Sequence, residues 1–301
     1  MDLSHYSFVS DGFASMGNIF TQRDCSQLLS DALRSRDFNE IFLTEDEFRS
    51  NPSISGNNPR PGRNLLSKLE TEFIFSNSLF QETMTRVLGP RWRILDYKFV
   101  VGLDNGSLPE WLSAELNDRP IANLGPYVKE HFRDLTYFRG IDFHQDILDF
   151  PDRDADFVTV YIYLDDVDVQ AAPLYVIPGS HQFGATVFPH NLVKNPNGSY
   201  TYTDDVGMTA NLECLCLTGC AGSMYYWHSA TLHGTQPTFG DQRRISVRIL
   251  VEKNSRAPMS CELDLLNASI RGPLSLGVTR KDLDDQGNLL VRQNIINLTE
   301  K

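Results

Sequence analysis

The chain has 301 residues, of which 41% are hydrophobic and 22% are charged, so it can bury one large core or two small ones. Its 39 acidic residues outnumber its 27 basic residues and give a net charge of −12. Such an acidic chain is a poor candidate for sequence-independent binding to nucleic acid, because that binding rests on basic contacts to phosphates.

The sequence shows no signal for a membrane or for export. No run of about 18 apolar residues occurs, so we expect no membrane span. The N-terminal residues lack the basic start and apolar core of a secretory signal, and the five cysteines are scattered. We therefore expect a cytoplasmic protein whose partner is a small molecule, and the sequence does not indicate its oligomeric state.

Residues 1–90 are predicted to be a helical leader. In the run FTQRDCSQLLSDALRSRDF, Thr21 is placed to cap a helix whose leucines recur at helical spacing. The run 65–89 predicts one or two more helices that end at Gly89. Between these helices, residues 49–63 are polar and rich in proline and glycine, which predicts a loop.

From residue 92 the chain consists of short runs rich in β-branched and aromatic residues, separated by turn signals. The predicted strands lie within residues 91–103, 156–166, 172–179, 210–219, 222–227 and 243–253. Several short strands after a helical leader indicate a mainly β fold with flanking helices, in which a closed or double-sheet core is covered by helices.

No linker composition divides the sequence, so we expect a single domain over residues 1–301. It comprises the helical leader 1–90, a β core 92–253 and a C-terminal extension 254–301. Within the extension, residues 278–298 predict a further helix.

The segment YFRGIDFHQDILDF, residues 137–150, has the rhythm of a strand and places His144 two residues before Asp146. Residues i and i+2 of a strand point to the same face, so the imidazole and the carboxylate would stand side by side. Such a pair is either a surface ion pair or two of the three protein ligands of a metal.

A third ligand should come from a distant strand that faces the first two. The run GSMYYWHSATLHGT offers both His228 and His233. Two histidines and one carboxylate on one side of an iron ion leave three adjacent positions open, as in non-haem Fe(II) oxygenases. A keto acid would take two of these positions and dioxygen the third, while the protein orients the substrate and excludes water.

A keto acid such as 2-oxoglutarate also carries a distal carboxylate, which an arginine can hold bidentately. Arg244 lies eleven residues after His233, and Ser246 is two further along the same predicted strand face. We expect Arg244 to clamp the carboxylate and Ser246 to add a hydroxyl donor. Arg243 and Arg248 are expected on a solvated basic edge.

The order HQD, APLYVIPGSH, LHGT and RRIS resembles the phytanoyl-CoA dioxygenase family of Fe(II)/2-oxoglutarate oxygenases, roughly over residues 95–251. The resemblance implies a double-stranded β-helix, a jelly-roll or cupin-like fold. It implies that Fe(2+) is held by His144, Asp146 and His233, and that 2-oxoglutarate is held by Arg244, with Thr235 as a second donor and Tyr161 as a nearby aromatic residue. The glycine after His233 fits this family, so we favour His233 over His228 and expect His228 to be packed.

Three residues are candidate substrate contacts because they lie on or beside strands that border the predicted iron. These residues are Lys98, Arg139 and Gln145.

The expected activity is that of an Fe(II)/2-oxoglutarate-dependent dioxygenase that oxidises an unactivated C–H bond of an amino acid or specialised metabolite. Hydroxylation is the default, oxidative cyclisation or desaturation can also follow, and succinate and CO2 are released. Asp146 argues against halogenation, because a halide needs the position that the carboxylate fills.

Three alternatives remain open. An acyl-CoA hydroxylase is disfavoured by the acidic chain, because the phosphates of coenzyme A call for basic groups. The others are a non-catalytic ligand-binding double-stranded β-helix and a structural or carbohydrate-binding jelly roll.

Overall fold

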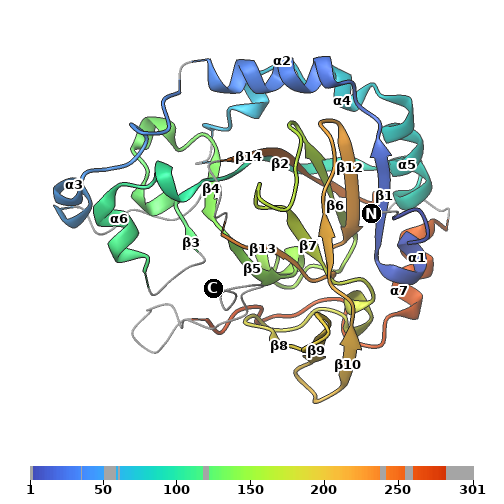
Figure 1. Ribbon diagram of the computed structural model, residues 1–301. Helices are drawn as coiled ribbons and strands as arrows, with labels where there is room; N and C mark the ends of the chain where they lie inside the picture. The colour runs from blue at the N-terminus through green and yellow to red at the C-terminus, as the bar shows by residue number, and fades with distance from the viewer. Residues whose placement is uncertain are drawn as a thin grey trace.

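A computed structural model describes residues 3–34, 36–50, 59, 62–117, 122–237, 242–254 and 260–282. Its core is a seven-stranded sheet that packs against a four-stranded sheet, with a small three-stranded sheet below them and helices around the large sheet (Figure 1). This arrangement confirms the predicted mainly β, jelly-roll fold with flanking helices.

The seven-stranded sheet has the order β1-β12-β6-β14-β2-β4-β3. Its strands are β1 (Phe13–Asn18), β12 (Ser223–His228), β6 (Phe157–Tyr163), β14 (Arg244–Glu252), β2 (Arg93–Gly102), β4 (Thr136–Arg139) and β3 (Ala122–Asn123). All neighbouring pairs are antiparallel except β2 and β4, which are parallel.

The four-stranded sheet has the order β11-β7-β13-β5, and the small sheet has the order β10-β9-β8. Their strands are β11 (Leu215–Leu217), β7 (Leu174–Val176), β13 (His233–Thr235), β5 (Ile141–His144), β10 (Thr209–Leu212), β9 (Tyr200–Thr203) and β8 (Asn191–Lys194). Because β13 pairs with β5, His233 lies directly across from His144.

The helices pack mainly around the large sheet. They are α1 (Phe8–Asp11), α2 (Gln22–Leu33), α3 (Glu45–Ser50), α4 (Glu72–Phe75), α5 (Ser78–Leu88), α6 (Glu110–Glu115) and α7 (Glu262–Ser269). Short 3-10 turns are η1 (Leu66–Lys68), η2 (Asn105–Ser107), η3 (Gly125–Tyr127), η4 (Glu130–Phe132), η5 (Asp146–Asp149) and η6 (Ser180–Phe183). Figure 1 shows α2 running along one edge and α1, α5 and α7 gathered beside β1.

Strand β14 shows why the sheet has two different faces. Ile245, Val247 and Ile249 pack with the helices in the largest hydrophobic cluster. Since successive side chains of a strand alternate, Arg244, Ser246 and Arg248 point to the other face, toward the four-stranded sheet. The inner face of β14 is therefore polar from Arg244 to Arg248, although every residue of the strand is buried.

The helix ends follow the sequence signals. The Thr21 hydroxyl accepts a hydrogen bond from the backbone N–H of Asp24 at 3.1 Å, as an N-cap does, and α5 ends at Gly89. Both predicted boundaries are confirmed.

The predicted helical leader is wrong in one respect, because the strand β1 lies within it. Its sequence, FASMGN, has little strand character, and its pairing with β12 in the edge position stabilises it instead. Of the C-terminal helix predicted over 278–298, residues 278–282 are not helical and the rest lie outside the described residues. The predicted loop at 49–63 also falls largely outside them.

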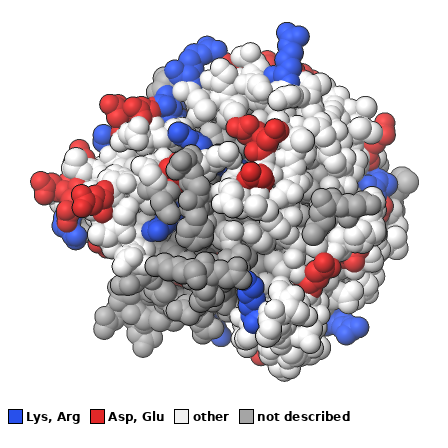
Figure 2. All heavy atoms as spheres, viewed as in Figure 1, with Lys and Arg blue, Asp and Glu red and all other residues white. Residues whose placement is uncertain are grey.

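In the described part of the chain, no helix is both long enough and apolar enough to cross a membrane. On the face drawn in Figure 2, basic side chains lie in scattered groups among acidic and uncharged ones.

The fold predicts a large stability difference between two apolar truncations. Ile249→Ala removes a fully buried side chain from β14, so we expect the free energy of unfolding to fall by about 2–5 kcal/mol. Leu79→Ala removes a side chain that is 45% exposed and should change it by about 0.5 kcal/mol or less. Urea unfolding followed by circular dichroism measures both, and equal losses would contradict the assigned core.

Candidate metal centre

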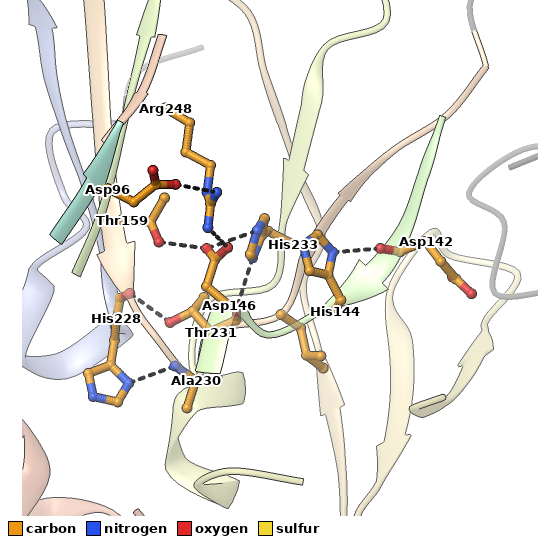
Figure 3. Close-up of polar contacts among 12 residues, drawn as sticks. Asp96, Asp142, His144, Asp146, Thr159, His228, Ala230, Thr231, His233 and Arg248 are labelled. Atoms are coloured by element: carbon orange, nitrogen blue, oxygen red, sulfur yellow. Dashed lines mark hydrogen bonds and ion pairs between the residues drawn. The ribbon is translucent and has the colours of Figure 1, made fainter. Parts of the chain in front are cut away.

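His144, Asp146 and His233 converge on one point. One potential ligand atom from each lies within 4.8 Å of the other two, and no other such group of His, Cys, Asp or Glu is found among the described residues. The imidazole centroids of His144 and His233 are 4.3 Å apart, and Nε2 of His233 is 3.3 Å from Oδ2 of Asp146. Figure 3 shows the three side chains turned toward each other.

Backbone carbonyls fix how the two imidazoles face this point. Nδ1 of His144 lies 2.8 Å from the carbonyl oxygen of Asp142, and Nδ1 of His233 lies 3.0 Å from that of Thr231. A carbonyl only accepts, so each Nδ1 carries the proton and each Nε2 keeps a lone pair for a metal. Two imidazole nitrogens and one carboxylate oxygen suit a ferrous ion with open positions.

The carboxylate of Asp146 is buried and charged. Burial by itself would raise the pKa of Asp146, but Arg248, His233 and His144 together hold it below its ordinary value. Arg248 forms an ion pair with Oδ1 at 3.0 Å, and the Thr159 hydroxyl donates to Oδ2 at 2.5 Å. Burial also lowers the pKa of His233 to about 3, which keeps this imidazole neutral.

The expected strand geometry at the HQD segment is wrong. His144 is the last residue of β5, whereas Asp146 begins the 3-10 turn η5. The two side chains therefore meet across a turn and not along one strand face. A carboxylate on a turn can approach the imidazoles more closely than the strand repeat of about 6.6 Å allows.

Gln145 does not face the metal point, so its predicted role as a substrate contact is not supported by its position. Its side chain is fully buried, and Nε2 donates to the carbonyl oxygens of Gly184 and Ala230, both at 2.8 Å. Oε1 accepts from the backbone N–H of Thr186 at 2.9 Å. Gln145 thus ties the segment of His144 and Asp146 to the segment that precedes His233.

Arg244 is a buried cation with hydrogen-bonding capacity to spare. Its guanidinium donates to the carbonyl of Ala172 and, at 3.3 Å, to the hydroxyl of Tyr161, while Nε has no partner. It forms no ion pair with a carboxylate among the residues that the structure describes. A buried guanidinium calls for a counter-ion, and the distal carboxylate of 2-oxoglutarate would supply one.

The other predicted cofactor residues lie on the strands around this point. Thr235 is buried on β13, two residues after His233, and Ser246 is buried on β14 across from Tyr163. Tyr161 is packed against Trp227, whose ring lies 4.7 Å from that of His233.

Two predicted substrate contacts differ in where they point. Lys98 lies across from Arg248 on the inner face, and burial together with Arg248 lowers its pKa to about 8. Arg139 follows Tyr137 by two residues on β4, and Tyr137 packs with the outer cluster, so alternation places Arg139 on the outer face. Lys98 is therefore beside the candidate centre, and Arg139 points away from it.

The prediction of a solvated Arg248 is also wrong. Arg248 is 9% exposed and pairs with both Asp146 and Asp96. The signal was present in the sequence, because Arg244, Ser246 and Arg248 follow one another at steps of two along a single strand. No sequence pattern indicated that the Thr159 hydroxyl would donate to Asp146.

His228 is packed, as expected. It is fully buried at the end of β12, and its Nδ1 accepts from the backbone N–H of Ala230 at 3.1 Å. Its Nε2 therefore carries the proton and donates to Oδ1 of Asn267 at 2.9 Å. Both ring nitrogens are engaged, so His228 is not available as a metal ligand.

The model of the phytanoyl-CoA dioxygenase family matches residues 120–246, a region that contains the three converging residues and Arg244. No curated protein matches the chain. The predicted family resemblance is confirmed over this region. With the donor set described above, the match also confirms the predicted enzyme class, an Fe(II)/2-oxoglutarate-dependent oxygenase, and its cofactors.

Two of the solved structures that resemble this fold cover most of the chain. One is the epimerase SnoN in complex with Fe3+, alpha ketoglutarate and nogalamycin RO, with a TM-score of 0.51 and 14% identity over 94% of this chain and 96% of that chain. The other is the non-heme monooxygenase ThoJ in its apo form, with a TM-score of 0.50 and 16% identity over 84% of this chain and 77% of that chain. At such identities the similarity is one of fold.

The ion pair between Arg248 and Asp146 predicts a pH effect on metal binding. In Arg248→Gln, burial of Asp146 is no longer opposed by a full positive charge, so the pKa of Asp146 rises. A metal binds the ionised carboxylate. As the pH is lowered, metal affinity of Arg248→Gln should therefore begin to fall at a higher pH than that of the wild type. Co(II) titrations between about pH 5 and pH 8 measure this shift.

Arg243→Gln is the matched control, because Arg243 is exposed and makes no contact with Asp146. Arg248→Lys keeps a positive charge and should lie between the wild type and Arg248→Gln. Coincident pH profiles for all four proteins would contradict the assigned electrostatics.

Proposed function

We propose that this protein oxidises an unactivated C–H bond of a small molecule and releases succinate and CO2, because residues 120–246 match the model of the phytanoyl-CoA dioxygenase family. The observation that carries this proposal is the convergence of His144, Asp146 and His233 on one point, together with a buried Arg244 that has no acidic partner among the described residues. The substrate is an amino acid or a specialised metabolite. Hydroxylation is the default outcome, and cyclisation or desaturation are the others.

In this proposal, His144, Asp146 and His233 would hold Fe(2+). Ferrous iron, when bound with 2-oxoglutarate, supplies the activation of dioxygen that a C–H bond requires. The charged Asp146 offsets part of the ion's charge, and the carbonyls of Asp142 and Thr231 hold the imidazoles in the binding tautomer. The ligands thus need little rearrangement to bind the metal.

Arg244 holds the distal carboxylate of 2-oxoglutarate, with Thr235, Ser246 and Tyr161 around it. Two of its nitrogens are already tied to Ala172 and Tyr161, which fixes the plane of the guanidinium. Nε has no hydrogen-bond partner among the described residues, so it and the positive charge remain for the ligand. Binding of the keto acid would therefore compensate a buried charge.

Lys98 is the substrate contact that we retain, because it lies on the inner face beside Arg248 and forms no ion pair among the described residues. Nogalamycin RO, the compound named with SnoN, belongs in the substrate panel together with amino acids. We further propose that residues 1–301 form one domain and that the protein is cytoplasmic, with a small molecule as its partner.

An acyl-CoA hydroxylase is the second candidate, because the matching family is named for an acyl-CoA substrate. The net charge of −12 disfavours it, since coenzyme A carries several phosphates. An acyl-CoA in the substrate panel separates the two candidates.

The test is succinate formation by the iron-loaded protein with 2-oxoglutarate, air and each candidate substrate. We expect one substrate class to stimulate succinate release. The mass of that substrate should change in proportion to the succinate formed. Asp146→Ala should lower turnover by more than the roughly 10–100-fold typical of changes around metal ligands. Arg244→Gln should raise the KM for 2-oxoglutarate by about tenfold to hundredfold, because a charged hydrogen bond is lost.

Arg243→Gln removes an exposed arginine next to Arg244 in the chain and should leave both constants unchanged. If Arg243→Gln and Arg244→Gln raise this KM equally, the clamp is wrongly assigned. If the wild-type protein forms no more succinate than the reaction without enzyme, with every substrate including the acyl-CoA, the proposed activity is wrong.

A further inference from the structure

The four residues between β12 and β13, 229–232, form a short loop that leads directly into His233. Its backbone hydrogen bonds reach many separate parts of the fold. Ser229 and Ala230 accept from Ile147 and Gln145, and Leu232 accepts from Ile177 and donates to the Ser180 hydroxyl. The place of His233 therefore depends on what holds this loop.

Thr231 has contacts in two directions at once. Its carbonyl oxygen lies 3.0 Å from Nδ1 of His233 and sets the orientation of that imidazole. Its hydroxyl donates to the carbonyl oxygen of Gly12 at 2.8 Å. A single residue thus links a candidate metal ligand to the N-terminal part of the chain, more than two hundred residues away.

Strand pairing brings Gly12 to this loop. Phe13 is the register partner of Trp227, so the preceding residue of the leader lies beside His228. The Gly12 carbonyl also accepts from the backbone N–H of His228 at 2.9 Å, so it accepts hydrogen bonds from both the loop and the end of β12. The residue that precedes the edge strand β1 therefore contacts the loop before His233, although it carries no metal ligand.

The approach is too close for any residue but glycine. Gly12 has a φ of 65°, and a Cβ built there would lie 2.3 Å from Nδ1 of His181 and 2.8 Å from Oγ1 of Thr231. The absence of a side chain at this position is what lets the Thr231 hydroxyl reach the carbonyl.

Helix α7 is connected to the same loop through His228, the last residue of β12. Oδ1 of Asn267 accepts from Nε2 of His228 at 2.9 Å, and Nδ2 of Asn267 donates to the Ala155 carbonyl at 2.9 Å. His228 in turn accepts from Ala230 within the loop, as Figure 3 shows. Residues of α1 and α7 share one hydrophobic cluster and lie together beside β1 in Figure 1.

We infer that Thr231 and Asn267 are positioning residues that set His233 for metal binding through the leader and through α7. The inference rests on the proposed function, because it takes His233 as a metal ligand. Neither residue touches the metal point. Removing either should loosen His233 and weaken metal binding without removing a ligand.

Co(II) titration of the metal-free protein tests this, with the visible absorption of the bound ion as the signal. Thr231→Val keeps the shape but loses the hydroxyl, and it should raise the dissociation constant for Co(II) by about tenfold and alter the spectrum. Thr231→Ser restores the hydroxyl and should recover most of the affinity. This rescue separates positioning from a general loss of stability.

The matched control is Thr83→Val. Thr83 is also buried, and its hydroxyl also contacts the β1 segment, at Sδ of Met16, but it does not contact the loop. It should lower thermal stability to a similar degree while leaving Co(II) affinity unchanged. Asn267→Ala lies at a half-buried site and serves as a second variant should Thr231→Val not fold.

Co(II) affinities of Thr231→Val and Asn267→Ala equal to the wild type would overturn the inference. If Asp146→Ala gives the same Co(II) spectrum as the wild type, the metal site itself is wrongly assigned, and the inference fails with it. The two failures are therefore distinguishable.

Discussion

A charged carboxylate held away from water constrains the whole centre. Removing an ionised group from water costs several kcal/mol unless other groups compensate it. At Asp146, Arg248 and Thr159 provide the compensation, with the two imidazoles alongside. A divalent cation at the convergence point would add the strongest compensation of all. The site is therefore arranged for positive charge before any metal arrives.

The strand β14 contributes both an apolar outer face and the two arginines of the centre. Its outward side chains, such as Val247, are anchored in the apolar core, while Arg244 and Arg248 point inward from the same backbone. A central strand paired on both sides moves little, so the two guanidinium groups are held at a fixed separation. Arg248 pairs with Asp146, and Arg244 forms no ion pair among the described residues. Rigid elements place functional groups more accurately than loops do.

Much of the fold and of the candidate site could be predicted from sequence, because the relevant signals are local. Alternating β-branched runs predict strands, and His144, Asp146, His233 and Arg244 stand in the order of a known family. The misplaced features depend on tertiary contacts. Strand β1 forms because β12 has a free edge, and Gln145 points away from the metal point because η5 turns the chain after β5. No local pattern encodes either contact.

The burial of Arg248 could have been predicted from sequence, since strand alternation alone places it on the same face as Arg244. Its partner, Asp146, comes from a turn about a hundred residues earlier, and only the folded chain brings them together. The role of Thr231 is equally non-local, because it depends on a carbonyl in the leader.

The most direct measurement is a crystal structure of the protein grown without oxygen in the presence of Fe(II) and 2-oxoglutarate, with anomalous diffraction at the iron edge. The account predicts one iron peak bounded by Nε2 of both His144 and His233 and by the Asp146 carboxylate, with the far end of the keto acid on Arg244. An iron peak elsewhere, or a keto acid that leaves Arg244 untouched, would contradict it.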